Sequence, residues 1–276
     1  MKNKKKNFLV IGSNSFSGSH FVNFTLSKNH KVIGISRSKE PPKVFLPYKN
    51  SKNIKNFKFI KMDINKDVKK IIKIIKKNKI NYIVNFASQS MVAESWDSPL
   101  DWYNTNVLGS INFVNNLSQV KNIKKYIHVS TPEVYGSTKI NLKENINYKP
   151  STPYAISRAT CDMHLQSLYK NFKFPVIFTR AANVYGPGQQ LYRIVPKCII
   201  TPRVDSKLTL HGGGISKRSF IYITDVVEAT YKLCFKSKNG QVYHISGNKL
   251  ISIKNLVLII FKLQNISITN FVKISK

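Results

Sequence analysis

The feature that most constrains the fold of this chain is a regular alternation of short apolar runs and longer segments of helical period. The runs are rich in Val, Ile and Phe and lie at residues 8–11, 32–35, 57–60, 82–86, 126–129 and 176–179. In the segments between them, apolar residues recur with the spacing of one helix face. Apolar strands that alternate with helices are typical of a parallel sheet covered on both faces. The pattern therefore predicts a doubly wound α/β fold.

The alternation ends near Tyr185, and this predicts how the chain is divided. The segment GPG at residues 186–188 opens a stretch of short, irregular elements. A helix expected at 224–235 and a strand expected at 242–245 return to the main sheet. We therefore expect residues 1–185, with 219–246 returning to them, to form one domain. Residues 186–276 are expected to form mainly a smaller C-terminal lobe that binds the substrate.

The chain carries a large positive charge, with 45 Lys and Arg residues against 12 Asp and Glu residues and a formal net charge of +33. Such a charge indicates either a nucleic-acid partner or a solvated, lysine-rich surface. Nucleic-acid-binding proteins concentrate Arg and Lys on one face or tail. Here the excess is mostly Lys and is spread over the whole length. We therefore expect no nucleic-acid partner, although the positive field would attract anionic ligands.

The cysteines and the N-terminus bear on the compartment. Cys161, Cys198 and Cys234 are far apart and form no C-x-x-C motif, so neither a disulfide framework nor a thiolate metal site is expected. The six histidines show no ligand spacing, and we predict no metal. The basic residues 1–7 precede an apolar run too short for a signal peptide, and no run is long enough to span a bilayer. We expect a cytoplasmic protein without a membrane partner.

A glycine-containing segment follows the first expected strand. Residues 12–18 read GSNSFSG and precede an apolar-periodic segment at 21–26, which is the strand, turn and helix order of a dinucleotide-binding fingerprint. In this arrangement the backbone approaches a pyrophosphate at the N-terminus of the helix. Ser15 stands where the G-x-x-G-x-x-G form has its middle glycine, and its small side chain is compatible with the turn. We expect a Rossmann-type domain with a nicotinamide dinucleotide; the alternative is a glycine turn without a ligand.

The end of the second expected strand bears on the choice of dinucleotide. NAD-selective Rossmann proteins carry an Asp or Glu there, which accepts a hydrogen bond from the ribose 2′-hydroxyl. This chain has Ser36, Arg37 and Ser38 instead, and a guanidinium beside hydroxyl groups suits a 2′-phosphate. We expect NADP or NAD, with NADP favoured. Asp63, just past the third strand, is expected either to contact the adenine or to form the N-cap of the next helix.

Three further segments follow strand ends, where ligands bind in an open parallel sheet. They read STPEVYG at 130–136, PYAISR at 153–158 and TRAANVYGP at 179–187. With NFASQS at 85–90 and RSFI at 218–221, they resemble the nucleotide-sugar epimerase/dehydratase family of the extended short-chain dehydrogenases/reductases. The dTDP-glucose and GDP-mannose 4,6-dehydratases are the most similar. The resemblance runs from about residue 8 to residue 263; family members usually continue further, so we expect a truncated or naturally short form.

The resemblance implies hydride chemistry on a sugar ring. In the family, a Tyr at the position of Tyr154 removes the proton of the C4 hydroxyl while the C4 hydride passes to the nicotinamide. A Lys normally follows four residues later on the same helix face, and its charge lowers the pKa of the Tyr. This chain has Arg158 there. Arg keeps the charge and can bond ribose hydroxyls, but it is bulkier and relays no proton at neutral pH.

The segment around Glu133 bears on whether the resemblance implies a dehydratase or an epimerase. Thr131 matches the hydroxyl residue aimed at the sugar O4, and Glu133 matches the dehydratase base at C5. Pro132 replaces the Asp with which dTDP-glucose enzymes protonate the departing C6 hydroxyl; GDP-mannose enzymes lack that Asp too. The resemblance thus implies a nucleotide-sugar 4,6-dehydratase. The alternatives are a 4-epimerase or reductase in which Glu133 is incidental or only a cap, and a non-catalytic dinucleotide-binding protein.

The expected site residues form three groups, and His211 is expected to be structural. The catalytic residues are Thr131, Glu133, Tyr154 and Arg158. The cofactor-binding residues are Gly12, Ser15, Phe16, Ser17, Gly18, Ser36, Arg37, Asp63, Ile64, Phe86, Ala87, Ser88, Ser130, Tyr154 and Arg158. The residues expected to bind a nucleotide-diphosphate sugar are Gln89, Ser90, Thr131, Asn183, Gln189, Gln190, Arg193 and Arg218. The resemblance also implies a homodimer through helices near 102–117 and 154–169.

Overall fold

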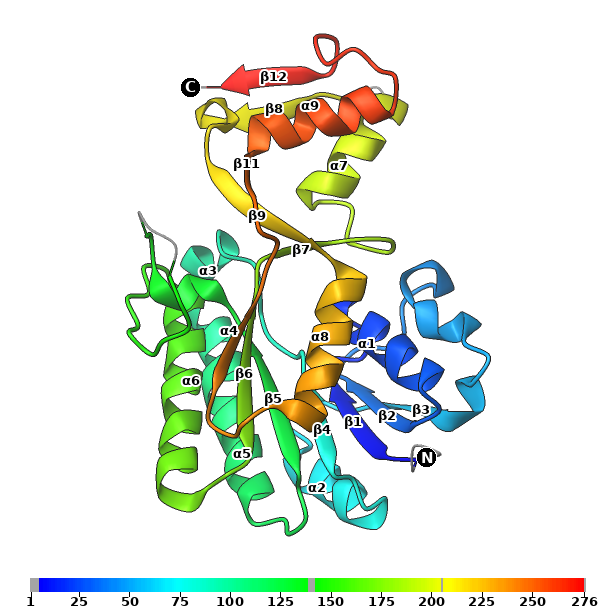
Figure 1. Ribbon diagram of the computed structural model, residues 1–276, viewed down its shortest axis with the longest axis vertical. Helices are drawn as coiled ribbons and strands as arrows, with labels where there is room; N and C mark the ends of the chain where they lie inside the picture. Colours follow the sequence, from blue (N-terminus) through cyan, green and yellow to red (C-terminus); the bar gives the residue numbers. More distant parts are fainter. Residues whose placement is uncertain (1–4, 139–141, 205, 276) are drawn as a thin grey trace. The chain divides into compact units, whose positions relative to one another are not determined.

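The computed structural model describes residues 5–138, 142–204 and 206–275, so residues 1–4 of the basic N-terminal run lie outside the described part. Its main sheet is formed by β1 (Asn7–Ile11), β2 (Lys31–Ser36), β3 (Phe57–Lys61), β4 (Tyr82–Asn85), β5 (Lys125–Ser130), β6 (Val176–Ala181) and β10 (Val242–Ile245) (Figure 1). The strand order is β10-β6-β5-β4-β1-β2-β3, and all neighbours run parallel. The order reverses between β1 and β4, as in Rossmann-type sheets. The predicted doubly wound α/β fold is confirmed.

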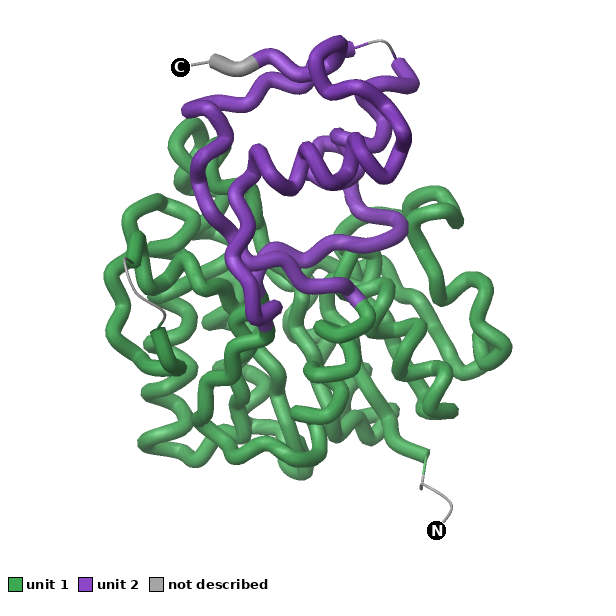
Figure 2. Tube along the Cα trace, turned by 45° about the horizontal axis from the view of Figure 1, so that its top comes forward, with its two compact units in different colours: residues 1–181, 224–245 green, residues 182–223, 246–276 purple. Residues whose placement is uncertain are grey.

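The chain divides into two compact units, one of residues 1–181 and 224–245 and one of residues 182–223 and 246–276 (Figure 2). The first unit holds the seven-stranded sheet and the helices α1 (Phe16–Ser27), α2 (Val68–Lys77), α3 (Glu94–Asp97), α4 (Pro99–Trp102), α5 (Ser110–Ser118), α6 (Pro153–Phe172) and nearly all of α8 (Ile223–Lys236). Between α4 and α5 the chain forms a π-helical turn, η4 (Tyr103–Gly109). No helix in the described ranges is long and apolar enough to cross a membrane.

The described residues of the second unit form two small sheets, two α-helices and short 3₁₀ turns. In one sheet, β9 (Lys217–Tyr222) lies between β7 (Asn183–Tyr185) and β11 (Leu250–Ser252); in the other, β8 (Leu208–His211) pairs with β12 (Val272–Ser275). The helices are α7 (Ile194–Ile200) and α9 (Ile253–Leu263). Helix α9 begins at Ile253, because Ser252 is its N-cap and accepts a hydrogen bond from the Asn255 amide at 3.1 Å.

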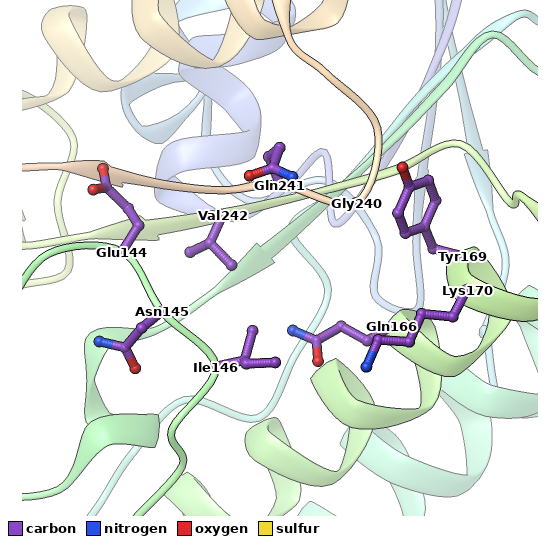
Figure 3. Close-up of a pocket in the computed structure, with 9 residues that line it drawn as sticks. All are labelled: Glu144, Asn145, Ile146, Gln166, Tyr169, Lys170, Gly240, Gln241 and Val242. Carbon is purple, nitrogen blue, oxygen red and sulfur yellow. The ribbon is translucent and has the colours of Figure 1, made fainter.

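Edge strand β10 borders a cavity of about 280 Å³ in the first unit. Its lining comes from the loop at residues 144–146, from Gln166, Tyr169 and Lys170 of α6, and from residues 240–242 (Figure 3). None of these residues was predicted to belong to a site. The lining is mixed in charge, since it includes the carboxylate of Glu144 and the ammonium group of Lys170.

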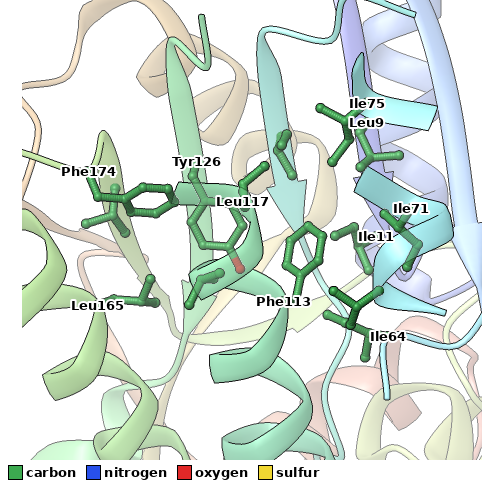
Figure 4. Close-up of a cluster of buried hydrophobic side chains, with 14 of the residues drawn as sticks. Leu9, Ile11, Ile64, Ile71, Ile75, Phe113, Leu117, Tyr126, Leu165 and Phe174 are labelled. Atoms are coloured by element: carbon green, nitrogen blue, oxygen red, sulfur yellow. The ribbon is translucent and has the colours of Figure 1, made fainter. Parts of the chain in front are cut away.

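The two faces of the main sheet bury different sets of side chains, because successive residues of a strand point to opposite faces. Leu9 and Ile11 of β1 pack with Ile71 of α2, Phe113 of α5 and Leu165 of α6 in the largest core cluster (Figure 4). Phe8 points to the other face, where its ring lies 6.3 Å from that of Phe21 in α1 and 6.3 Å from that of Phe235 in α8. Each fully buried side chain of this size contributes about 1.5–3 kcal/mol to folding. This burial fixes the strand ends on which the candidate site depends.

Candidate functional site

The turn after β1 lies at the point where the strand order of the sheet reverses. Gly12 adopts a φ of +79°, and a Cβ atom there would lie 2.7 Å from the backbone nitrogen of Ala87 in the neighbouring loop. Only glycine fits this conformation and this close approach. The Gly12 amide donates to the Ile35 carbonyl at 2.7 Å, which joins the turn to the end of β2.

Ser15 occupies the middle position of the glycine motif without strain. Its φ of −71° and ψ of 160° are extended values open to any residue, so glycine is not required there. The Ser15 hydroxyl donates to the Gly12 carbonyl at 2.7 Å and accepts from the Gly18 amide at 3.1 Å, which makes Ser15 the N-cap of α1. At Gly18, a Cβ atom would lie 2.1 Å from the Gly12 carbonyl oxygen. The first turn of α1 is therefore closely packed against the turn after β1.

The three residues at the turn after β2 differ in their exposure to solvent. Ser36 is buried, and its hydroxyl accepts from the backbone amide of Asn14 at 3.0 Å. Arg37 and Ser38 are exposed. A ligand at this turn would therefore meet the guanidinium of Arg37 and the hydroxyl of Ser38, whereas the Ser36 hydroxyl already has a partner within the fold.

Asp63 does not cap the following helix, and that alternative is wrong. The N-cap of α2 is Asp67, and the Asp63 carboxylate accepts instead from the backbone amide of Asn65 at 2.8 Å. Ile64 is part of the large core cluster. Phe86 is also buried, with its ring 5.6 Å from that of Phe21.

The loop after β4 is held by a residue that the sequence analysis missed. Asn106, on the π-helical turn η4, is fully buried. Its side chain accepts from the Gln89 amide at 2.8 Å and donates to the Gln89 carbonyl at 3.0 Å. It also donates to Ser157 of α6 at 2.9 Å. Asn106 thus joins the loop of Ser88, Gln89 and Ser90 to the helix that carries Tyr154.

The end of β5 leads directly into a short 3₁₀ helix, η5 (Pro132–Tyr135). Thr131 is buried and is the N-cap of η5, since its hydroxyl accepts from the Glu133 amide at 3.2 Å. The Glu133 side chain is exposed. Glu133 is therefore capped by Thr131 and does not itself serve as the cap. Val134 and Tyr135 pack against Ala159, which joins η5 to α6.

Helix α6 carries the other two predicted catalytic residues. Thr152 is its N-cap and accepts from the Ala155 amide at 3.1 Å, so Tyr154 lies in the first helical turn. Tyr154 and Arg158 are both buried. The Arg158 Nη2 atom donates to the Val129 carbonyl of β5, while its Nη1 atom is buried with no hydrogen-bond partner among the described residues. The structure thus brings α6, the end of β5 and η5 together.

A buried polar cluster that the sequence analysis did not predict lies beside Arg158. Asp162 accepts from Ser130 at 2.8 Å and from Arg180 at 2.9 Å, and its other oxygen lies 3.3 Å from His128 Nε2. Burial lowers the pKa of His128, and the charge of Arg158 lowers it further, so the imidazole is neutral. Burial alone would raise the pKa of Asp162, but the neighbouring His128 side chain and the charge of Arg180 lower it overall. Polar residues inside or next to the apolar runs 126–129 and 176–179 were the available sequence signal.

Five of the residues expected to bind a nucleotide-diphosphate sugar lie in the second unit. They are Asn183, Gln189, Gln190, Arg193 and Arg218. Asn183 of β7 is exposed and donates to the Ser219 carbonyl of β9 at 3.1 Å. Gln189 is buried and donates to the Val184 carbonyl at 2.7 Å. Arg218 is exposed on β9.

Two more of these residues stand at the start of α7. The Gln190 carbonyl accepts from the Arg193 amide at 3.0 Å, and Arg193 is the N-cap residue of α7. His211 is exposed at the end of β8. Within the described residues, no group of three His, Cys, Asp or Glu side chains could hold a metal ion.

Comparisons with known proteins agree with this arrangement. The family model described as GDP-mannose 4,6 dehydratase matches residues 9–274. The human dTDP-D-glucose 4,6-dehydratase is 33% identical over 261 residues, which cover 91% of this chain and 72% of the human protein. The Dictyostelium discoideum dTDP-D-glucose 4,6-dehydratase is 34% identical over 265 residues, covering 88% of this chain and 59% of that protein.

Solved structures show the same likeness. A dTDP-glucose 4,6-dehydratase from Bacillus anthracis in complex with NAD has a TM-score of 0.85 and 29% identity, covering 98% of this chain and 85% of that chain. A UDP-N-acetylglucosamine 4-epimerase from Methanobrevibacter ruminantium has a TM-score of 0.88 and 28% identity, covering 99% and 86%. The resemblance read from the sequence is confirmed. The chain belongs to the GDP-mannose 4,6-dehydratase family, within the extended short-chain dehydrogenase/reductase group of nucleotide-sugar epimerases and dehydratases.

Proposed function

We propose that this protein is a nucleotide-sugar 4,6-dehydratase that uses a nicotinamide dinucleotide. The observation that carries the proposal is the placement of Thr131 and Glu133 at the end of β5, on a 3₁₀ turn packed against α6. Helix α6 carries Tyr154 and Arg158. This grouping holds the acid-base residues of both an oxidation and an elimination on neighbouring elements of one rigid unit.

The turn after β1 fits a dinucleotide. Gly12 and Gly18 leave no side chain over the turn, and α1 begins there with its positive dipole end. The buried and unpaired Nη1 atom of Arg158 is a donor that a ribose hydroxyl would satisfy. We infer that the backbone of residues 12–18 holds the pyrophosphate and that Arg158 holds the nicotinamide ribose. The bound dinucleotide would supply reversible hydride transfer.

Tyr154 is the proposed base for the sugar C4 hydroxyl. Arg158 lies one helical turn after Tyr154, so its positive charge would stabilise the phenolate that forms when the proton is removed. The Thr131 hydroxyl accepts from the Glu133 amide, which leaves its own hydrogen to be donated to the sugar oxygen. Thr131 would thus orient the hydroxyl from which Tyr154 removes the proton.

Glu133 is the proposed base for the elimination step. Oxidation at C4 places a carbonyl next to C5 and acidifies the C5 proton. A carboxylate can then take that proton while the C6 hydroxyl leaves, and water is lost across C5 and C6. The Glu133 side chain is exposed, so a substrate can reach it. Return of the hydride to C6, together with a proton from solvent at C5, would complete a 6-deoxy-4-keto sugar.

The remaining substrate contacts are proposed for residues with amide, hydroxyl or guanidinium side chains, which can donate hydrogen bonds to a diphosphate. In the first unit these are Gln89 and Ser90. In the second unit they are Asn183, Gln189, Gln190, Arg193 and Arg218. The Arg218 side chain donates to the Lys217 carbonyl at 2.9 Å and is exposed, so a phosphate could compete for it.

We infer a preference for NADP over NAD, because Arg37 stands where an acid would repel a 2′-phosphate. The solved relatives named with a dinucleotide contain NAD, so the preference would be a property of this chain. Arg37→Ala is expected to weaken NADP binding more than NAD binding. A clear NAD preference that is unchanged by Arg37→Ala would contradict the inference.

The second candidate is a nucleotide-sugar 4-epimerase, since a relative of similar fold has that name. An epimerase would use Thr131 and Tyr154 but would not need Glu133. The deciding experiment is incubation with GDP-, dTDP- and UDP-hexoses, followed by mass spectrometry. A product lighter by one water that contains a 4-keto-6-deoxy sugar supports dehydration. A product of unchanged mass with inverted C4 supports epimerisation.

A further inference from the structure

Asn14 links the turn after β1 to the turn after β2 through hydrogen bonds. Its side-chain Nδ2 atom donates to the carbonyls of Ser38 at 3.2 Å and Lys39 at 3.0 Å. Its backbone amide donates to the Ser36 hydroxyl at 3.0 Å. One residue therefore makes three hydrogen bonds to a segment of four residues that contains Arg37.

The orientation of the Asn14 carboxamide is fixed by these partners. If the amide were rotated by half a turn, its oxygen would face two carbonyl oxygens, which have no hydrogen to donate. In the observed orientation, the Asn14 Oδ1 atom is buried and has no hydrogen-bond partner among the described residues. An unpaired buried acceptor is destabilising. In this orientation the Asn14 Oδ1 atom stays unpaired, while the Nδ2 atom donates to the carbonyls of Ser38 and Lys39.

As a result, the carbonyl groups and the positively charged side chains of the turn after β2 face different surroundings. The carbonyl oxygens of Ser38 and Lys39 are directed to Asn14, whereas the side chains of Arg37, Ser38 and Lys39 are exposed. A free carbonyl attracts a ribose hydroxyl, which is a donor, and repels a phosphate. Two cations and a hydroxyl attract a phosphate.

We propose that Asn14 is a specificity-determining positioning residue for the adenosine end of the dinucleotide. By holding the carbonyls of Ser38 and Lys39 away from the ligand, it favours a ribose that carries a 2′-phosphate over one that carries a 2′-hydroxyl. This inference rests on the proposed dinucleotide site. It assigns to Asn14 no part in the chemical step.

The chain offers a matched control for the loss of these hydrogen bonds. Asn7, at the opposite end of β1, also donates through Nδ2 to two successive carbonyls, those of Asn78 at 3.0 Å and Lys79 at 3.3 Å. Leucine has nearly the size of asparagine but no donor. Asn14→Leu and Asn7→Leu therefore each remove one amide that bridges two carbonyls, and only Asn14 adjoins the turn with Arg37.

The experiment compares the dissociation constants of NADPH and NADH for the full chain and both variants, by nucleotide fluorescence. In Asn14→Leu, the preference for NADPH is expected to fall by about tenfold, the effect of weakening one hydrogen-bonded charge contact. In Asn7→Leu the preference should stay within about twofold of the parent. The same fall should appear when adenosine 2′,5′-bisphosphate and 5′-AMP are compared, which tests the adenosine end alone.

The outcomes separate this inference from the proposed function. If the parent binds both dinucleotides and Asn14→Leu leaves their ratio unchanged, the inference is wrong and the proposed function stands. An equal change in Asn7→Leu would also overturn it, because the effect would then be a general loosening of the fold. If the parent binds neither dinucleotide, the proposed function itself fails. Asn14→Ser replaces Asn14→Leu if circular dichroism shows that the leucine variant does not fold.

Discussion

The Nη2 atom of Arg158 lies 3.2 Å from the Nε2 atom of His128, in the interior of the first unit. The same Nη2 atom donates to the carbonyl of Val129. Arg158 is therefore attached to β5 by one end of its guanidinium, while the Nη1 end has no hydrogen-bond partner in the described part of the chain. A lysine has a single side-chain nitrogen, which would have to bond the Val129 carbonyl and a ligand at the same time. Substitutions at Arg158, where the family has a lysine, therefore test the role of this side chain.

We expect Arg158→Lys to keep or raise turnover, because the positive charge near Tyr154 is retained. Arg158→Ala should lose most of it, by about 10²- to 10⁴-fold, the range of a well-placed acid-base contribution. The measurement is kcat for the 4-keto-6-deoxy product across pH. Alanine that matched the parent at every pH would mean that Arg158 has no part in activating Tyr154.

Glu133→Gln separates dehydration from epimerisation. The amide keeps the size of the side chain but is not basic, so oxidation at C4 should persist while the 6-deoxy product falls by about 10²- to 10⁴-fold. Substrate binding should change little. In D₂O the parent should place deuterium at C5 of the product. Full activity of Glu133→Gln, or a C4-epimerised product that keeps its 6-hydroxyl, would support the epimerase.

Asp162→Asn is expected to destabilise the protein strongly. Removing one partner of a buried ion pair typically costs about 3–5 kcal/mol, and Asp162 holds both Arg180 and Ser130. Because the pKa of Asp162 is lowered in the fold, its stabilisation is present above about pH 4, its unfolded pKa, and is lost as the pH falls further. Urea unfolding at neutral and acidic pH measures both effects. Glu228→Gln, which breaks an exposed pair with Lys232, is the control and should change stability far less.

His128 should make the fold sensitive to mild acid. Its pKa is lowered by burial and by Arg158, so the unfolded chain takes up a proton more readily than the folded one. Stability from this residue is therefore complete above about pH 6.5 and declines as the pH falls below that value. His128→Gln is expected to reduce the steepness of this decline by up to about 1.4 kcal/mol per pH unit. Equal slopes for the parent and His128→Gln would contradict the assignment.

The homodimer that the family resemblance implies can be tested at exposed apolar side chains of η4 and α6. Leu108 of η4 and Met163 of α6 are 63% and 49% exposed, and η4 contacts α6. Exposed apolar side chains on adjacent helices are typical of an interface. Leu108→Glu with Met163→Glu should convert a dimer into a monomer in light scattering at micromolar concentration. Leu263→Glu, on α9 of the second unit, should leave the mass unchanged. A parent protein that is already a monomer would rule out the dimer.

The sequence determined the fold class, because periodicity is a local property. The apolar runs at residues 8–11 and 82–86 become β1 and β4, and the order of strands and helices allows few topologies other than a doubly wound sheet. The family could also be identified from the sequence, because its motifs lie in short continuous segments such as residues 130–136 and 153–158.

The tertiary structure decided which polar side chains meet. Asn14 and Lys39 are 25 positions apart, and Asn106 and Ser157 are 51 apart, so no local pattern predicts either hydrogen bond. The same holds for Asp63: its sequence context suits a helix cap, but the chain turns through Asn65 first and Asp67 takes that place. Hydrogen bonds between distant residues depend on how strands and helices pack, and packing is a property of the whole unit.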